Sequence, residues 1–252
     1  EVNETTDGKR GFVGYEPKAG PEILRGANIS LYALREASQG QAIYLRQKKF
    51  LEGKPDSEKA RHHEQCRIGW QESSPQNNFR RIIAAPIPKG EYCNHKINYI
   101  PECESKPPLD FLLALLNSKL YDWFFRLSSS NAAVSHYQIA ILPAPEIAAG
   151  TGAEGWKELL KRSAWIELEK VLCSACTTPG VMPTTVAEAI AAMSKRIQEI
   201  EARRIMKSRS DRSQLAAESA PIQEIIDAVI FRCFGLSDTE GEYISNRLAE
   251  ML

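Results

Sequence analysis

The stretch that decides the fold is residues 109–127, which read LDFLLALLNSKLYDWFFRL. From Leu109 to Leu127 the apolar side chains recur mostly three or four positions apart, the spacing that lines one face of an α-helix. Phe111 and Leu115 lie off that face, so the helix is expected to be buried on two sides. The pattern predicts one helix over 109–127, opened by two prolines and ended by the polar run 128–131.

The chain before this helix is predicted to be strand-rich. Short apolar or alternating runs are separated by polar segments that contain Gly or Pro, a pattern typical of strands joined by loops. These runs are residues 41–46, 66–70, 79–85 and 97–100. Between the second and third run lies the loop 71–78, QESSPQNN, in which nearly every side chain can form hydrogen bonds. The hydrophilic segment 47–64 indicates no particular element.

The chain after the helix is predicted to be helical. Residues 147–155 are rich in Ala and Gly and are expected to form a linker, and the polar stretch 208–220 is expected to be mobile. Helices are predicted over 156–172, from Thr185 to about 207, from Pro221 to 233, and from 237 to 252. The sequence therefore predicts an α+β fold, with a mixed, strand-rich domain over 1–146 and an all-α domain over 147–252.

The ends of these helices carry recognisable capping signals. Thr185 with Glu188, and Ser237 with Glu240, have the three-residue spacing of capping boxes. Gly235 follows the third helix, where a residue without a Cβ most easily adopts the left-handed conformation that ends a helix. We expect helices to begin and end at these residues.

Composition is that of an ordinary globular protein, with 43% apolar and 25% charged residues in 252. No apolar run approaches the roughly 20 residues that span a bilayer, and no secretion signal opens the chain. Six cysteines are spread thinly, so we expect reduced thiols in the cytoplasm and not a disulfide framework.

Charge is balanced over the whole chain, with 32 basic and 32 acidic residues, but not along it. Between Arg25 and Lys96 thirteen basic residues stand against seven acidic ones. A locally basic face fits a module that meets phosphate on one side only. A solvated, Lys-rich surface would give the same count, and charge alone does not separate the two interpretations.

Motifs of catalysis are missing from the sequence. It contains no Gly-rich cofactor loop after a strand, no Asn-Pro-Pro-Tyr-like methyltransferase motif, no Gly-x-Ser-x-Gly and no His-Glu-x-x-His. The acidic residues and lysine of 55–59, PDSEK, resemble a nuclease signature but are crowded into one hydrophilic loop. We therefore expect no catalytic site in this chain.

Metal binding is also weakly indicated. His62, His63 and Cys66 lie close together, and Cys93 with His95 could complete a mixed set, but the spacing matches no standard zinc finger. A lone Cys-x-x-Cys over 173–176 has no second pair downstream. Inert or buried thiols are the preferred interpretation of both groups, and no metal is expected.

Four stretches, in order along the chain, resemble one protein family. Residues 25–29, RGANI, resemble an Arg-Gly-x-x-Ile element near the start of the TaqI-like specificity domain. Residues 111–126, FLLALLNSKLYDWFFR, resemble that family's LLALLNSKL helix, and residues 137–145 resemble the strand that follows it. Residues 226–236 are similar to the ending of large adenine methyltransferases of type IIG restriction–modification and phage-exclusion systems, although Cys233-Phe234 stands where Leu-Tyr is usual.

The resemblance implies that this chain is the target-recognition part of a longer enzyme, with its helices as a C-terminal spacer. The chain begins at Glu1 and not at Met, which also suggests a piece of a longer protein. The N-terminal part would be an S-adenosylmethionine-dependent adenine-N6 DNA methyltransferase, with or without a nuclease. Expected partners are double-stranded DNA and that methyltransferase domain, with no cofactor in this part and no membrane.

The loop 71–78 and the arginines after it supply the side chains that such a role needs. Arg reads guanine and Asn or Gln reads adenine in the major groove, whereas Lys binds phosphate without reading sequence. On a strand, Arg80 and Arg81 point to opposite faces, so at most one is expected to face the bases. The predicted DNA-binding residues are Arg25, Asn28, Lys48, Lys49, Arg67, Gln71, Asn77, Asn78, Arg80, Arg81 and Lys89.

Other functions remain open at this point. The helical half could dock on a partner protein, with the basic face incidental, and the near-heptad helix from Thr185 suits a spacer or docking helix. A separate specificity subunit of a multi-subunit restriction system is a further alternative, as is a complete enzyme with an unrecognised site.

Overall fold

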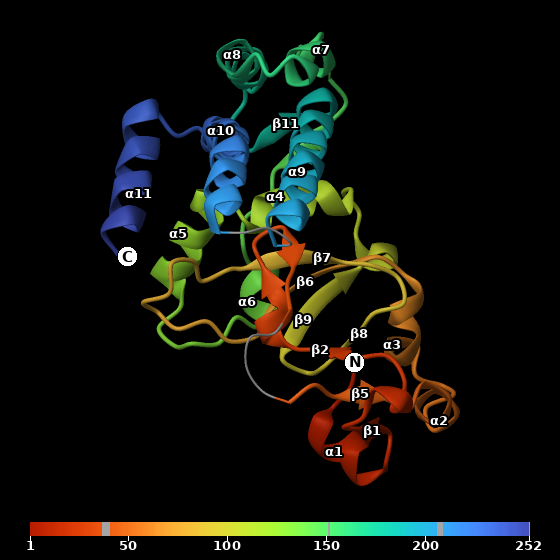
Figure 1. Cartoon of the computed structure of the whole chain (residues 1–252). Coiled ribbons are helices and arrows are strands. Elements are labelled where there is room, and N and C mark those ends of the chain that lie inside the picture. Colours follow the sequence, from red (N-terminus) through yellow and green to blue (C-terminus); the bar gives the residue numbers. More distant parts are fainter. Residues whose placement is uncertain (37–40, 151, 206–208, 252) are drawn as a thin grey trace.

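The computed structural model describes residues 1–36, 41–150, 152–205 and 209–251, and shows an α+β fold. Figure 1 shows its layers from top to bottom: α7 and α8, then α9 and α10, then α4 above a small sheet, and last the N-terminal elements. α5 and α11 lie beside these layers, at the left of the view. The strand-rich part and the helical part therefore meet at α4.

The strands are short and form several small sheets. In the main sheet β6 lies between β7 and β9 and is antiparallel to both, with Gly69 opposite Ala85 on one side and Tyr99 on the other. The remaining strands pair in twos: β1 with β5, β2 with β8, β3 with β4, and β10 with β11. The bounds are β1 Val13–Gly14, β2 Ile23–Leu24, β3 Ile29–Ser30, β4 Ala33–Leu34, β5 Tyr44–Leu45, β6 Arg67–Gln71, β7 Ala84–Ile87, β8 Tyr92–Cys93, β9 Ile97–Pro101, β10 Glu146–Ala148 and β11 Val181–Pro183.

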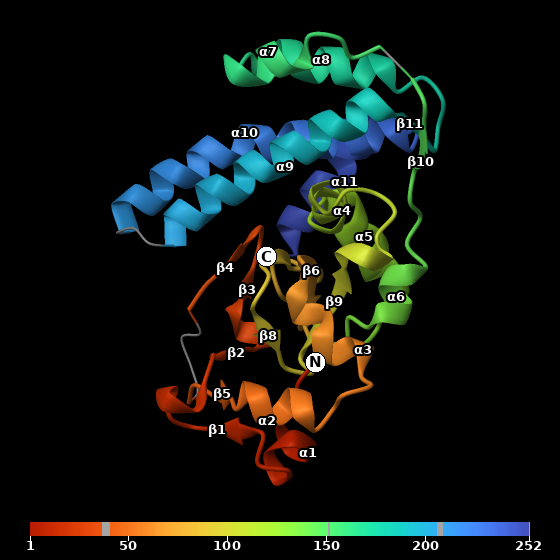
Figure 2. The same cartoon turned by 90° about the vertical axis from the view of Figure 1, so that its right-hand side faces the viewer.

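The helices become longer toward the C-terminus, and α9 and α10 run side by side as a pair (Figure 2). Their bounds are α1 Glu4–Lys9, α2 Gln47–Glu52, α3 Glu58–Arg61, α4 Leu109–Leu116, α5 Lys119–Ser128, α6 His136–Ala140, α7 Trp156–Lys161, α8 Trp165–Ala175, α9 Thr184–Ile205, α10 Arg209–Cys233 and α11 Asp238–Glu250. Four 3₁₀ turns are described as well, at Pro17–Ala19, Gly26–Asn28, His62–Glu64 and Glu102–Glu104.

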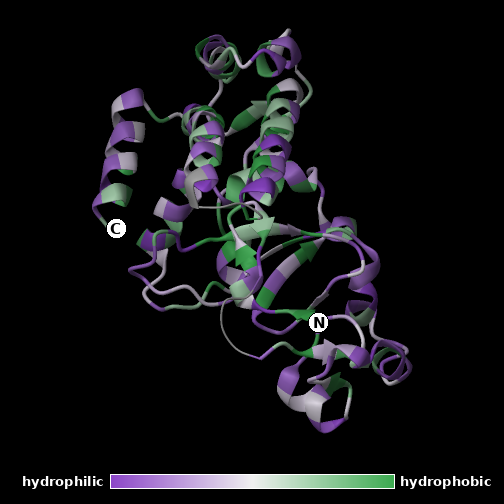
Figure 3. Ribbon diagram, viewed as in Figure 1, coloured by the Kyte–Doolittle hydropathy of each residue, from purple (hydrophilic) through white to green (hydrophobic). Residues whose placement is uncertain are grey.

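One apolar core runs from the sheet through α4 into the helical layers. It joins Trp70 of β6 and Phe111 of α4 to Ile190 of α9 and Ile226 of α10. Figure 3 shows the apolar residues gathered where the sheet and α4 meet these two helices. The core therefore crosses the boundary predicted between 146 and 147, and the division into two domains stays a prediction.

The helix predicted over 109–127 is wrong in one respect, because it is two helices. α4 ends at Leu116 and α5 begins at Lys119. Between them, Asn117 accepts a hydrogen bond from the backbone N–H of Ala84 and donates one to its carbonyl, both at 3.0 Å. Ser118 then caps α5 by accepting from the N–H of Tyr121. The side chain of Asn117 thus forms hydrogen bonds with the backbone of β7, as a neighbouring strand would, and this contact interrupts the helix.

Three further expectations are corrected. Residues 137–145, compared with a strand of the family, contain no strand: their first part belongs to α6, which ends at Ala140 and whose start carries a capping box of Ser135 and Gln138. The part of the predicted mobile stretch that the structure describes, 209–220, belongs to α10. Pro221 consequently lies inside that helix and does not open it.

α10 continues through Pro221 because the turns before the proline are held by α9. Arg203 forms an ion pair with Glu218 at 3.1 Å, and the Ser219 hydroxyl donates to Glu201 at 3.1 Å. A proline inside a helix removes one backbone hydrogen bond and costs about 3 kcal/mol. These contacts and the packing of the two helices offset that cost.

Two of the predicted helix ends near the C-terminus are confirmed. Ser237 and Glu240 form the predicted capping box of α11, and Gly235, with φ of 80°, follows α10 as predicted. Thr185 behaves differently, because its hydroxyl donates to the carbonyl of Gly150 at 3.5 Å. α9 starts one residue earlier, at Thr184, whose hydroxyl donates to the carbonyl of Ala148.

The structure also bears on membrane crossing and on the state of the cysteines. Over the described ranges, no helix combines the length and apolar character that a membrane crossing requires. All six cysteines fall within these ranges, and each is a free thiol.

Candidate nucleic-acid interface

The polar loop between β6 and β7 pairs with a second loop that follows α5. The N–H of Ser74 donates to the carbonyl of Ala132, and the N–H of Val134 donates to the carbonyl of Glu72, both at 2.8 Å. Ser73 and Ala133 are antiparallel bridge partners. We call these two segments, residues 72–81 and 128–134, the paired loops. These contacts join the two loops at one place, just beyond the Gln71 end of β6.

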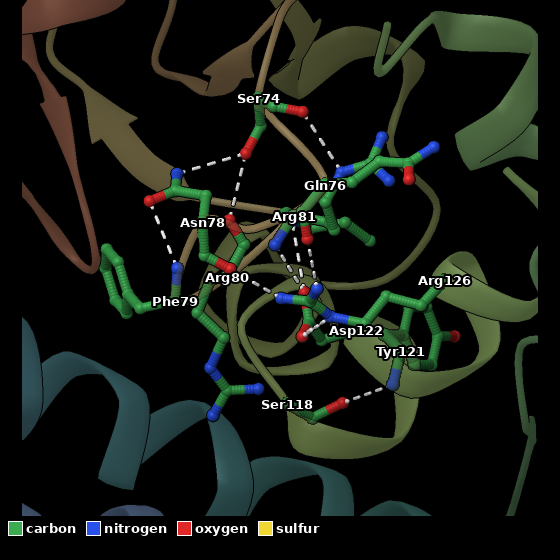
Figure 4. A network of polar contacts seen from close by, with 11 residues as sticks. Ser74, Gln76, Asn78, Phe79, Arg80, Arg81, Ser118, Tyr121, Asp122 and Arg126 are labelled. Atoms are coloured by element: carbon green, nitrogen blue, oxygen red, sulfur yellow. Dashed lines mark hydrogen bonds and ion pairs between the residues drawn. The ribbon is translucent and has the colours of Figure 1, made fainter. Parts of the chain in front are cut away.

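The first of the paired loops is held by two charged side chains of α5 (Figure 4). Arg126 donates to the carbonyls of Gln76 and Asn78, both at 2.8 Å, and its Nε donates to Asp122 at 2.9 Å. Asp122 also accepts from the backbone N–H of Arg81 at 2.6 Å and of Ile82 at 3.4 Å. The α5 carboxylate and guanidinium together fix the path of the loop.

Arg81 is buried between the paired loops and forms hydrogen bonds with both of them. Its side chain is 1% exposed, and it donates to the carbonyl of Ser74 at 3.1 Å and of Asn131 at 2.6 Å, one on each of the paired loops. Its guanidinium also lies over the ring of Phe125. Burial lowers the pKa of Arg81 and the charge of Arg126 lowers it further, whereas Asp122 raises it. Arg81 therefore joins the two loops and is not exposed to a ligand.

The paired loops nevertheless expose several polar side chains. Asn77 is exposed and forms no side-chain hydrogen bond with the part of the protein that the structure describes. Gln76 is exposed, and its side-chain amide donates to the carbonyl of Ser130. Ser130 and Asn131 are exposed on the second loop. Amide and hydroxyl groups are thus presented on a backbone that is already fixed.

Four other predicted DNA-binding residues form hydrogen bonds within the protein. Arg67 is 2% exposed and donates to the carbonyl of Glu91 at 2.6 Å, and the amide of buried Asn28 donates to the carbonyl of Arg35 at 3.0 Å. Gln71 donates to the carbonyl of Ile29 and Asn78 to the hydroxyl of Ser74. Arg67, Asn28 and Arg81 are buried and form these bonds within the protein, which argues against their assignment to DNA. Gln71 and Asn78 are partly exposed.

The predicted lysines are exposed but distant from the paired loops. Lys48 and Lys49 lie on α2. Lys89 lies in the turn between β7 and β8, which is at the Arg67 end of β6, whereas the paired loops adjoin the Gln71 end. In Figure 1 α2 is at the lower right, whereas the loop between β6 and β7 is at the left. Arg25 lies nearer, because the adjoining Gly26 approaches the carbonyl of Lys96, which accepts from the N–H of Glu72. The structure does not gather the predicted set on one face.

Arg80 is directed away from Arg81, toward the helical layers, as Figure 4 shows. It is half-buried beside a polar cluster in which the Tyr32 hydroxyl donates to Gln223 at 2.6 Å and the N–H of Lys119 donates to Asp227 at 2.8 Å. Three buried atoms of this region have no hydrogen-bond partner among the described residues: Nη1 of Arg80, Nε2 of Gln223 and Oδ2 of Asp227. Burial raises the pKa of Asp227, which Arg80 and Lys119 counteract.

Replacing Asp227 by Asn is expected to raise the free energy of unfolding at pH 7. A carboxyl whose pKa is raised on folding destabilises the folded state when ionised, and this cost disappears as the pH falls through the raised pKa toward the unfolded value near 4. The advantage of the variant should therefore shrink between pH 7 and pH 4, measured by urea unfolding. The control is Asp56→Asn, which removes a charge from an exposed position. A gain in the free energy of unfolding of Asp227→Asn that did not change with pH would contradict the raised pKa of Asp227.

Sequence reasoning missed the residues that hold the loops. Asp122 and Arg126 are four positions apart, a spacing that indicates an ion pair on one helix, and the pair does form. Nothing local indicates that this pair would also bind a loop more than 40 positions earlier in the chain. Gln76, Ser130 and Asn131 were missed as well, although 128–131 was recognised as polar.

Comparison with models of protein families gives no match, and a search of curated proteins gives none. The family resemblance therefore depends on the four sequence stretches alone. Among the residues that the structure describes, no group of three or more His, Cys, Asp or Glu is arranged to hold a metal ion. His62 bonds Tyr99 and His63 bonds the carbonyl of Ala60, so both rings have partners within the protein.

Proposed function

We propose that this chain recognises double-stranded DNA in a sequence-specific manner, and that the paired loops are the reading surface. The observation that carries the proposal is that Asp122, Arg126 and Arg81 bind the backbone of the paired loops, while Asn77 is exposed and forms no side-chain hydrogen bond with the described residues. Gln76 is exposed as well. Side-chain amides read adenine in the major groove. A loop whose backbone is already fixed also avoids the entropic cost of becoming ordered on binding.

Phosphate contacts in this proposal come from basic residues next to the paired loops. Lys96 is exposed and forms an ion pair with Glu72 at 3.0 Å. Arg25 lies near Lys96, because the adjoining Gly26 approaches the carbonyl of Lys96. Lys48, Lys49 and Lys89 would contact phosphate only if the DNA followed the protein surface away from the paired loops. Such contacts position DNA without reading its sequence.

The wider assignment follows from the resemblance. The chain would serve as the target-recognition module of a restriction–modification adenine-N6 methyltransferase in the cytoplasm. S-adenosylmethionine and the catalytic residues would belong to a methyltransferase domain outside this chain, and the module itself would not be catalytic.

A docking module is the second candidate, and one observation favours it. An apolar cavity of about 1010 Å³ lies between α4 and α6, lined by residues that include Phe111, Leu112 and Ile139. Tyr137 on its rim is 74% exposed. Exposed apolar patches of this kind commonly mark protein contacts.

Replacing Asn77 by Ala is expected to weaken binding to the preferred duplex by about 1–3 kcal/mol, roughly five- to 150-fold, because a bidentate contact with a base is lost. Binding to unrelated duplexes should not change. The preferred sequence is first selected from a random duplex library, and affinities are then measured by fluorescence anisotropy at several salt concentrations. Affinity should fall steeply with salt.

The matched control is Asn246→Ala, an exposed asparagine on α11, which should leave affinity and preference unchanged. Selection of no sequence, with equal binding to all duplexes, would contradict sequence-specific recognition. Equal behaviour of Asn77→Ala and Asn246→Ala would remove Asn77 from the reading surface.

A further inference from the structure

The paired loops carry three charged side chains, and each of them is paired, buried or directed inward. Glu72 forms an ion pair with Lys96 at 3.0 Å, at the start of the first loop. Arg81 is 1% exposed and donates to carbonyls of both loops. Arg80, the third, is half-buried and directed toward the helical layers, as Figure 4 shows.

The two charged side chains of α5 that hold the first loop are engaged within the protein as well. The side chain of Arg126 is 9% exposed, and its three nitrogen atoms donate to Asp122 and to the carbonyls of Gln76 and Asn78. Asp122 is 1% exposed. In the major groove, Arg or Lys reads guanine, and Glu or Asp accepts from cytosine. Over residues 72–81 and 128–134, all of which the structure describes, the outer surface presents neither a free cation nor a free carboxylate.

The side chains that the paired loops do expose carry amide and methyl groups. Asn77 is exposed and forms no side-chain hydrogen bond with the described residues, and Ala132 and Ala133 are exposed on the second loop. The side-chain amide of Gln76 donates to the carbonyl of Ser130, so the exposed parts of the two loops are in contact. A side-chain amide reads adenine in the major groove, and the methyl group of an alanine contacts the methyl group of thymine.

We propose that the paired loops read A·T base pairs, so that the preferred DNA sequence has A·T and not G·C at the positions these loops contact. The inference rests on the proposed function and deepens it, because it names the bases that the reading surface takes. The amide of Asn77 donates to N7 of adenine and accepts from its N6 amino group. A G·C pair at the same place meets no guanidinium and no carboxylate, and its cytosine has no methyl group to contact the alanines.

The first experiment selects preferred duplexes from a random library, once with the unchanged chain and once with Asn77→Ala. The base pairs at which the variant loses its preference are those that Asn77 reads, and they should be A·T pairs. Replacing one of them by G·C in the preferred duplex should weaken binding of the unchanged chain about five- to 150-fold, measured by fluorescence anisotropy. The same replacement should have a much smaller effect on binding by Asn77→Ala.

The second experiment replaces Asn77 by Arg, which supplies the guanidinium that the exposed surface of the loops lacks. The preferred base at one position should change from adenine to guanine, because an arginine side chain pairs with O6 and N7 of guanine. The matched control is Asn246→Arg, which adds the same charge at an exposed position of α11 and should leave the preferred bases unchanged. Circular dichroism and melting temperature check that each variant is folded.

Base analogues test the individual contacts without altering base pairing. 7-Deazaadenine lacks the N7 acceptor, so at the position read by Asn77 it should weaken binding of the unchanged chain but not of Asn77→Ala. Uracil in place of thymine removes one methyl group and should weaken binding about fourfold, because that methyl group is buried against the protein in the complex.

Failure of this inference and failure of the proposed function have different signatures. A preferred sequence in which the pairs that depend on Asn77 are G·C would overturn the A·T assignment and leave sequence-specific recognition intact. An Asn77→Arg variant with the same preferred bases as Asn246→Arg would overturn the assignment too. Equal binding of all duplexes by the unchanged chain would overturn the proposed function, and this inference with it.

Discussion

Replacing Asp122 by Ala is expected to lower the free energy of unfolding by about 3–5 kcal/mol, because breaking a buried ion pair leaves the other charge without compensation. Asp122 is 1% exposed and accepts hydrogen bonds from Arg126 at 2.9 Å and from the N–H groups of Arg81 and Ile82. All of these donors lose their acceptor together in the variant. Urea unfolding followed by circular dichroism measures the change.

The same substitution is expected to abolish sequence-specific DNA binding while part of the fold remains. Without Asp122, Arg126 has no carboxylate to orient it toward the carbonyls of Gln76 and Asn78. Amide hydrogen exchange in residues 72–81 should therefore become faster, even under conditions in which the rest of the chain is folded.

Asp110→Ala is the matched control, since Asp110 is a partly buried carboxylate of α4 that accepts one hydrogen bond from Gln198, at 2.7 Å. It should cost about 1 kcal/mol and leave DNA binding unchanged. Similar losses for the two variants would mean that Asp122 has no special role in holding the loops.

Asn117→Ala is the second substitution with a large expected effect. It leaves the N–H of Ala84 buried without its acceptor, which costs about 1–3 kcal/mol, and it removes one of two donors to the carbonyl of Ala84, which the N–H of Tyr32 still satisfies. The loss of the second hydrogen bond adds about 1 kcal/mol, so that about 2–4 kcal/mol is expected in total. Thermal and urea unfolding measure it. The melting transition should broaden or split if α4 and the sheet separate.

Ser118→Ala separates the tertiary contact from the local one. Ser118 caps α5, and loss of such a cap costs about 1 kcal/mol. A larger loss for Ser118→Ala than for Asn117→Ala would indicate that local capping, and not the contact with Ala84, positions the two helices.

Several features could be predicted from sequence because their causes are local. The capping box of Ser237 and Glu240 and the left-handed Gly235 depend on residues within a few positions of each other. The α+β fold and the apolar face of residues 109–127 follow from the period of the apolar residues. Exposure of Asn77 agrees with its place in a run of polar residues.

The tertiary structure alone decided three features: the break at Asn117, which of Arg80 and Arg81 is buried, and the continuation of α10 through Pro221. Each depends on a partner far away in the chain: Ala84 for Asn117, Asn131 for Arg81, and α9 for the turns before Pro221. A sequence pattern indicates which side chains favour burial or hydrogen bonding, but not which groups they bind. Two residues of one type, such as Arg80 and Arg81, can therefore differ completely, because only folding determines which guanidinium is surrounded by carbonyl oxygens.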